Sequence, residues 1–355
     1  MTNRRQFLQN TAGIGFVSCG LLDAAQRGKS TGAGGRRQVS VGGRRVKTVD
    51  VHGHVLIPEA FALTGAKPNP TEAQAIASAE DRLRVMDEQG VDVQAISINP
   101  FWYGTGREVA AKIVKLQNEK LAELCAAHPD RFVGYASVAL QHPDLAVEQV
   151  TEGIKKLGLR GVSIGARVGG DELSHPKFHP FWAKVEELGV LVFMHPAALP
   201  ELQQRLQGNG LLTNTIGNPL DTTIALSHMI FEGTFDRFPK LKLCAAHGGG
   251  YLGSYGDRSD NSCRVFPQSC TPGLPKKHPT EYLKQLYVDS ILFTSEGLRH
   301  LIANTGAGQV MIGTDFPYPW NTNPVDHILN TPGLSNAERR AILGETAAKL
   351  LGIAS

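Results

Sequence analysis

The sequence predicts an α/β protein built as a closed (β/α)8 TIM barrel. Eight short β-branched runs alternate with helical patterns from Val46 onward, over roughly 310 of the 355 residues. The runs are apolar on both faces, as strands of a parallel sheet must be when helices cover both sides. Such a barrel takes ~250 residues plus insertions. An open doubly wound sheet would accept the same alternation, but no GxGxxG motif follows the first run, which disfavours it.

The predicted strands and helices follow one another in order along the chain. The strands are short runs rich in valine, isoleucine and other apolar residues, predicted at 46–54, 91–99, 131–140, 159–168, 190–197, 241–250, 285–293 and 309–317. The intervening helical patterns are predicted at 78–89, 107–127, 144–157, 180–188 and 222–235, and a last helix is predicted at 335–351.

Side chains that can bind a metal ion, histidine and aspartate, lie at the ends of four of the eight predicted strands. Chemistry in a barrel of this kind sits at the C-terminal ends of the strands. The first strand ends in His52 and His54, which share one face because side chains alternate along a strand. Strands five, six and eight end in His195, His247 and Asp315. Neutral imidazole is the commonest metal ligand, so these five residues predict a metal site.

The other strand ends and the other histidines carry no such signal. Strands two, three, four and seven are expected to end without a metal-type cluster. Taken alone, the His-Gly-His motif would also fit two polar residues at a loop mouth. The remaining histidines fall in predicted helices or loops, where solvation or a local partner accounts for them: His128, His142, His175, His179, His228, His278, His300 and His327.

Composition excludes some function classes. The net charge is +3 and 41% of residues are hydrophobic, so a sizeable core can form. A charge this small, without a basic-aromatic stripe, argues against nucleic acid as a partner. The five cysteines show no CxxC spacing, so neither a thiolate zinc site nor a disulfide framework is expected.

The N-terminus resembles a twin-arginine export signal. Arg4 and Arg5 precede Phe7 and Leu8, and an uncharged run of twelve residues, 11–22, follows. That run is too short to span a bilayer, which takes about 20 residues, so stable membrane insertion is not expected. We therefore predict a signal peptide at 1–25 and a periplasmic protein. If the signal is not used, the segment is an amphipathic tail and the protein is cytoplasmic.

A flexible linker and one large domain are predicted to follow the signal. Residues 26–45 are rich in glycine and arginine and contain no acidic residue. Such a segment cannot bury a core, so it is predicted to be a tether or a surface tail. The barrel domain is expected at 46–355.

The motifs from Thr48 to Ile353 resemble those of the amidohydrolase superfamily. The likeness is to the amidohydrolase-related branch that contains aminocarboxymuconate-semialdehyde decarboxylase. An HxH motif alone is a weak indication of the family. FPKLKLCAAHGGG followed by GTDFPYP, in this order, is a specific indication. The matching segments include VDVHGH, VFMHPA, FPKLKLCAAHGGG, GTDFPYP and AAKLLGI.

The resemblance implies a metal site and a role for each residue in it. One divalent metal, usually zinc and sometimes manganese, is implied to be bound by His52, His54, His195 and Asp315. His247 is implied to be the catalytic acid/base beside the metal, and Asp315 is expected to be catalytic as well as a metal ligand. The fourth strand has no lysine that could form a bridging carbamate, which disfavours a two-metal site.

Substrate recognition is less well defined by the resemblance. Arg258 lies eleven residues after His247, and in these decarboxylases an arginine at that offset reaches the site of a neighbouring subunit and holds a substrate carboxylate. This implies a homodimer, although Arg258 would also fit a solvated loop. The decarboxylase has an arginine soon after HxH, but in this chain Lys67 is the only lysine or arginine within residues 55–74. The decarboxylase also has an aromatic residue at the position of Ala197 in this chain.

We therefore expect a metal-dependent, non-oxidative decarboxylase of a small unsaturated or aromatic carboxylic acid. Hydrolysis of an amide or lactone by the same site is the alternative. A binding protein that kept the barrel is a third reading, which the presence of all five site residues disfavours.

Overall fold

The computed structural model describes residues 35–197 and 199–354. The predicted signal peptide, and the first part of the predicted linker, lie outside the described residues. Among those described, no helix combines the length and hydropathy needed to cross a bilayer.

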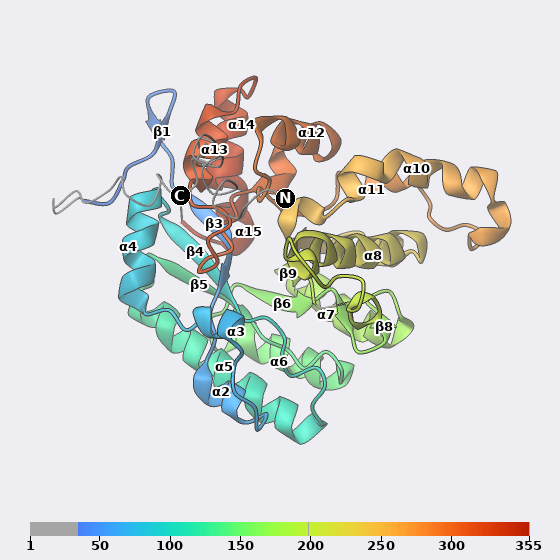
Figure 1. Ribbon diagram of the computed structural model, residues 1–355, viewed down its shortest axis with the longest axis horizontal. Coiled ribbons are helices and arrows are strands. Elements are labelled where there is room, and N and C mark those ends of the chain that lie inside the picture. Colours follow the sequence, from blue (N-terminus) through green and yellow to red (C-terminus); the bar gives the residue numbers. More distant parts are fainter. Residues whose placement is uncertain (1–34, 198, 355) are drawn as a thin grey trace, which may run out of the picture. The chain divides into compact units, whose positions relative to one another are not determined.

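Within the described ranges, eight parallel strands form the predicted barrel (Figure 1). Neighbours along the sheet follow chain order. Backbone hydrogen bonds join the first strand to the segment of the last: Val51 N–H donates to Ile312 O at 2.9 Å, and His54 N–H to Phe316 O at 2.7 Å. This seam closes the sheet, so the barrel prediction is confirmed. The strands are β3 (Val49–His54), β4 (Val93–Ser97), β5 (Phe132–Ala136), β6 (Gly161–Gly165), β9 (Leu191–His195), β10 (Lys242–Ala245), β11 (Tyr287–Asp289) and β12 (Val310–Met311).

Helices cover the outside of the barrel close to their predicted positions. The predicted helix at 222–235 begins four residues earlier and is divided at Gly233. The last predicted helix is also divided, by a break at Gly344. The helices are α2 (Pro58–Ala62), α3 (Pro70–Gln74), α4 (Ala79–Gln89), α5 (Arg107–Ala127), α6 (Pro143–Lys155), α7 (His179–Leu188), α8 (Asn218–Phe231), α9 (Thr234–Arg237), α10 (Leu252–Val265), α11 (Pro279–Tyr282), α12 (Ser295–Thr305), α13 (Pro324–Asn330), α14 (Asn336–Arg340) and α15 (Thr346–Leu351).

The inside of the barrel is a packed apolar layer that ends at the histidines. Tyr135 and Phe193 stack with ring centroids 5.4 Å apart, and both are fully buried. The Phe193 ring also contacts His52, with centroids 4.8 Å apart. The histidines at the strand ends therefore pack against buried aromatic side chains of the barrel interior.

A β-hairpin places the start of the folded part earlier than the predicted Val46. Strands β1 (Ser40–Val41) and β2 (Arg44–Arg45) pair antiparallel, and Val39 and Val41 are buried in the core. Arg45 Nη2 donates to both oxygens of buried Asp92 at 2.7 Å. The prediction that the folded part begins at Val46 is therefore wrong. Valines at every second position give the hairpin an apolar face, and a buried carboxylate neutralises its arginine.

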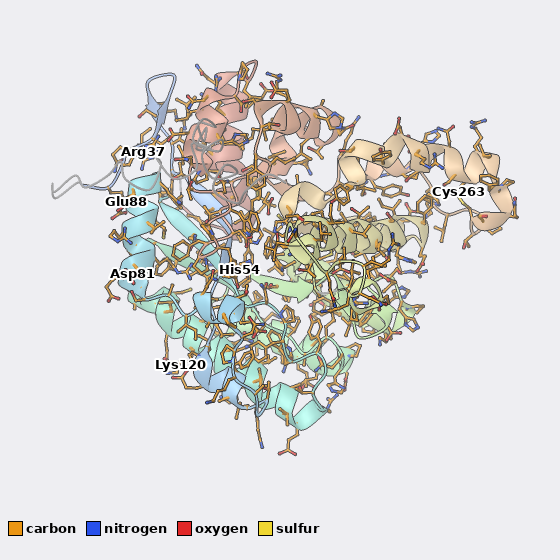
Figure 2. The ribbon with its side chains drawn as sticks, in the orientation of Figure 1. Arg37, His54, Asp81, Glu88, Lys120 and Cys263 are labelled. Atoms are coloured by element: carbon orange, nitrogen blue, oxygen red, sulfur yellow. A yellow bond between two sulfur atoms is a disulfide. The ribbon has the colours of Figure 1, made fainter. Side chains whose placement is uncertain are left out.

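An arm formed by α10 and α11 extends away from the barrel (Figure 1). Cys263 and Cys270 form a disulfide near its far end, where Figure 2 labels Cys263. The cysteine spacing indicates no disulfide framework, and it did not reveal this single bond. Large apolar side chains are exposed on the arm: Tyr255 (70%), Val265 (50%) and Phe266 (57%).

Candidate metal centre

The five predicted site residues converge at the C-terminal end of the barrel. His52, His195, His247 and Asp315 each offer one ligand atom, and these four atoms lie within 4.8 Å of one another. His54 joins them, because its Nε2 lies 2.9 Å from His52 Nε2 and 2.9 Å from Asp315 Oδ1. His247 Nε2 lies 3.7 Å from Asp315 Oδ2. His247 is thus near enough to be considered a ligand, and its role as acid/base stays a prediction.

Local backbone geometry explains the glycine in the His-Gly-His motif. A Cβ atom on Gly53 would lie 2.6 Å from the buried side chain of Gln94. Gly53 therefore lets β3 run close to β4 between the two histidines.

Two of the site residues have a left-handed backbone. The φ angles are +55° at His247 and +61° at Asp315. This conformation is uncommon for residues other than glycine and costs of order 1–3 kcal/mol. At Asp315 it lets the backbone N–H donate to His52 O at 2.8 Å while the carboxylate faces the histidines. Both residues thus keep an unfavourable backbone conformation that points their side chains into the metal centre.

The Nδ1 atoms of the three histidines predicted as ligands all have partners, which leaves Nε2 for the centre. His52 Nδ1 lies 2.6 Å from Asp289 Oδ2, and His54 Nδ1 lies 3.1 Å from Ser97 Oγ. His195 Nδ1–H donates to Pro196 O at 2.9 Å. Partners of this kind fix the tautomer and the orientation of a metal-binding imidazole.

Asp289, at the end of β11, is the functional residue that sequence reasoning missed. Its carboxylate contacts the His52 ring, and it also accepts hydrogen bonds from the backbone N–H groups of His247 and Gly248, each at 2.9 Å. Strand seven was expected to end without a cluster of metal-binding residues, and its lone aspartate was therefore given no role. The only signal was a single aspartate closing the apolar run QLYVD.

The electrostatics of the cluster favour a cation. Burial lowers the pKa of His52, but the carboxylates of Asp315 and Asp289 outweigh it and raise that pKa to about 10. Burial lowers the pKa of His54 to about 4, and burial with the neighbouring imidazoles holds the pKa of His195 well below its usual value. Burial alone would raise the pKa of Asp315, yet the adjacent imidazoles hold it well below its ordinary value. Two buried carboxylates thus require positive charge among the imidazoles.

The donor spacing fits a single divalent ion. Two donors that each lie ~2.1 Å from one ion are ~3.0–3.4 Å apart at ordinary ligand angles. Asp315 Oδ1 lies 2.9 Å from His54 Nε2 and 3.2 Å from His52 Nε2, close to this spacing. Within the described chain, Oδ1 has no partner with good hydrogen-bond geometry. A buried carboxylate oxygen facing imidazole nitrogens is what a metal site of three histidines and one aspartate requires.

A buried polar network supports the centre from below. Asp50 accepts hydrogen bonds from His52 N–H at 2.9 Å, Gln94 Nε2 at 2.6 Å and Thr314 Oγ1 at 2.6 Å. Burial raises the pKa of Asp50 to about 6. Arg82, also buried, donates to His54 O and to the Gln94 side chain. The network therefore ties β3, β4 and the Asp315 segment together beneath the histidines.

Two cavities are lined by residues of the metal centre. One, of about 400 Å³, is lined by His247 and Asp315 together with apolar side chains that include Tyr251, Phe293 and Trp320. The other, of about 180 Å³, is lined by His54, Glu72 and Tyr318 among others. Among the described residues, neither cavity has a lysine or arginine in its lining.

Arg258 is not part of this centre within its own chain. It lies on α10 and lines a separate cavity beside Phe231, Phe266 and Cys270. Its predicted role therefore requires a second copy of the chain.

A closed barrel with three imidazoles and a carboxylate at its C-terminal mouth defines the class of metal-dependent barrel enzymes. The amidohydrolase family model matches residues 49–353, and the chain belongs to this family.

Three relatives illustrate the similarity. The chain is 31% identical over 275 residues to 2-amino-3-carboxymuconate-6-semialdehyde decarboxylase from Dictyostelium discoideum, covering 77% of this chain and 76% of that protein. It is 30% identical over 318 residues to gamma-resorcylate decarboxylase from Rhodococcus jostii, covering 84% and 96%. The crystal structure of a dihydroxybenzoic acid decarboxylase from Polaromonas, with bound manganese and the inhibitor 2-nitroresorcinol, has a TM-score of 0.76 at 24% identity and covers 87% and 97%.

Asp289→Asn should weaken metal binding about 10–100-fold, the usual cost of losing a group that orients a metal ligand. The amide keeps the size of the side chain but removes the charge that orients His52. Competition against a chelator, with manganese or zinc, measures the affinity. Asp144→Asn, an exposed carboxylate on α6, is the matched control. Unchanged affinity in Asp289→Asn would show that Asp289 does not act on the metal site.

Proposed function

We propose that the chain is a metal-dependent, non-oxidative decarboxylase of a small aromatic or unsaturated carboxylic acid. The observation that carries this proposal is the position of His247, which faces Asp315 and lines the larger cavity on the metal centre. The decarboxylase relatives support the same reaction class. Hydrolysis of an amide or lactone would use the same donors, but no feature of the cavities favours it.

The larger cavity suits a planar, mostly apolar substrate. Tyr251, Phe293 and Trp320 supply aromatic surface, and a few polar groups can orient ring substituents: Asn214, Thr215 and Ser254. Because no lysine or arginine lines this cavity among the described residues, a carboxylate there meets positive charge only at the metal centre. The reacting carboxylate should therefore lie at the His247 end of the cavity.

The metal would be held by His52, His54, His195 and Asp315. When bound, it supplies a positive charge that orients the substrate and stabilises negative charge developing on it. We propose zinc as the ion most in keeping with the family resemblance, and manganese as the alternative. The donor types suit both, and the Polaromonas relative carries manganese.

The chemical step needs a proton at a defined atom. Loss of carbon dioxide leaves the bonding electron pair on the ring or vinyl carbon, and that carbon must gain a proton. We propose that His247 Nε2 delivers it, because this nitrogen lies at the catalytic end of the cavity, 3.7 Å from Asp315 Oδ2, and an imidazole N–H can donate a proton. Asp289 holds the His247 backbone, and the facing carboxylate of Asp315 stabilises the protonated ring.

A second copy of the chain would complete the substrate site. We propose a homodimer in which the α10–α11 arm carries Arg258 towards the partner subunit, where its planar fork can pair with a substrate carboxylate. The exposed apolar side chains Tyr255, Val265 and Phe266 on the arm support an interface there.

We propose that the protein is periplasmic and is exported by a twin-arginine signal. The adjacent Arg4 and Arg5, followed by Phe7 and Leu8, support this route. The disulfide between Cys263 and Cys270 agrees with an oxidising compartment.

His247→Ala should lower decarboxylation of gamma-resorcylate by about 10²–10⁴-fold, the usual worth of a positioned proton-transfer group. Its metal content should stay near normal. Carbon dioxide release by the manganese-loaded protein measures the rate, and elemental analysis measures the metal. His195→Ala is the comparison, because loss of a ligand should remove metal and activity together. If His247→Ala loses metal as His195→Ala does, His247 is a ligand and the assignment is wrong.

Replacing Arg4 and Arg5 by lysine should leave the precursor in the cytoplasm, because the export receptor reads the arginine pair. Cell fractionation followed by immunoblotting measures the distribution. Substituting Arg36 and Arg44 by lysine tests whether arginines elsewhere near the N-terminus matter. An unchanged periplasmic yield of the Arg4/Arg5 variant would contradict a twin-arginine route.

A further inference from the structure

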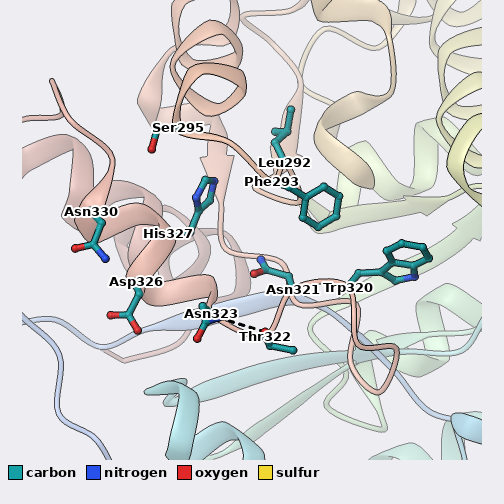
Figure 3. Close-up of a pocket in the computed structure, with 10 residues that line it drawn as sticks. All are labelled: Leu292, Phe293, Ser295, Trp320, Asn321, Thr322, Asn323, Asp326, His327 and Asn330. Carbon is teal, nitrogen blue, oxygen red and sulfur yellow. Dashed lines mark hydrogen bonds between the residues drawn. The ribbon is translucent and has the colours of Figure 1, made fainter. Parts of the chain in front are cut away.

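A second cavity lies directly beside the one that contains His247. We call the cavity lined by His247 and Asp315 the catalytic cavity, and its neighbour, of about 420 Å³, the outer cavity (Figure 3). The two share three lining residues, Leu292, Phe293 and Trp320. Phe293 is 66% exposed, so solvent reaches part of this shared wall. One elongated ligand could therefore occupy both cavities.

The outer cavity has one apolar side and one polar side. Figure 3 shows Leu292, Phe293 and Trp320 on one side, and the ring of His327 between Ser295 and these apolar side chains. The polar side comes from α13 and the loop before it and is rich in amides: Asn321, Thr322, Asn323, Asp326 and Asn330. A ligand that fits here needs an apolar face and several hydrogen-bonding groups.

The polar side of the outer cavity carries little net charge. The carboxylate of Asp326 is paired with Arg37, whose Nη1 lies 2.9 Å from Oδ2. Burial lowers the pKa of His327, which favours its uncharged ring. Among the described residues, no lysine or arginine lines this cavity. The cavity therefore suits a neutral ligand better than an anion or a cation.

Unused hydrogen-bonding capacity is also present. His327 Nε2 is buried and has no partner within the described chain. An amide side chain can both donate and accept, and no hydrogen bond within the described residues engages the side chain of Asn330, which is exposed at the end of α13. Several neutral donors and acceptors therefore face one aromatic wall.

We propose that the outer cavity is a subsite for a neutral glycosyl group carried by the aromatic acid that reacts at His247. A sugar ring has a face of C–H groups that can pack on Trp320 and Phe293, and an edge of hydroxyls that can pair with amides and imidazole. The shared wall lets the aromatic ring lie in the catalytic cavity while the glycosyl group lies in the outer one. The part of this inference that concerns turnover rests on the proposed function, whereas the sugar site can be tested without it.

Binding is tested first, on the full chain, with methyl β-D-glucopyranoside as the probe. Trp102 and Trp182 are fully buried, so a change in tryptophan fluorescence reports mainly on Trp320. A saturable change is expected, and Asn330→Ala and His327→Ala should weaken it. Asn304→Ala, on α12 and outside the cavity lining, is the control. No saturable change, or one that neither cavity variant alters, would overturn the subsite.

Turnover is tested next, with gamma-resorcylate and with its derivative glucosylated on the ring carbon opposite the carboxylate. Asn330→Ala should lower kcat/KM for the glucosylated acid about 5–10-fold, as expected for one or two lost hydrogen bonds. It should leave kcat/KM for gamma-resorcylate unchanged. Equal effects on both acids would overturn the inference. If neither acid is decarboxylated, gamma-resorcylate is not a substrate of the proposed decarboxylase, and the fluorescence titration alone decides the sugar site.

Discussion

The hydrogen bonds that close the barrel decide where every functional side chain lies. His54 donates to Phe316 O and Asp315 donates to His52 O, so the first strand and the segment after the last one are held in a fixed register. This seam places Asp315 against the two histidines of β3, although some 260 residues separate them in the chain. The other donors follow because β9, β10 and β11 end at the same level of the sheet. The metal centre therefore forms because hydrogen bonds between the first strand and the segment after the last strand close the barrel.

Burying several imidazoles and carboxylates at one site costs solvation free energy, and contacts with the surrounding structure offset this cost. Buried imidazoles and carboxylates are unfavourable unless they are paired. Asp289 pairs with His52 and holds the turn that carries His247, and the Asp50 network holds the backbone of β3. Both left-handed residues lie where these hydrogen bonds fix the chain. The centre is thus preorganised by its supports, which is how positioned charges gain catalytic value.

The sequence was enough to locate the strand ends, but it did not reveal which side chains on different strands contact one another there. His52 and His54 could be predicted because their spacing has a direct meaning on a strand, and His195, His247 and Asp315 because each closes an apolar run. Asp289 is a lone carboxylate without a spacing partner, so only the closed barrel reveals that it faces His52. The disulfide was missed for a similar reason, because its pairing depends on the turn after α10. The hairpin at 40–45 was hidden by its glycines and arginines, whose charge is balanced by Asp92, far away in the sequence.

We propose that one divalent ion is bound by His52, His54, His195 and Asp315, with His247 beside it as the proton donor. Crystallography of the manganese-loaded protein, with anomalous scattering to locate the metal, tests this most directly. We predict one manganese ion per chain, bonded to three imidazole Nε2 atoms and to Asp315, with the His247 ring outside bonding distance. A structure with two ions, or with His247 bonded to the metal in place of His54, would contradict the account.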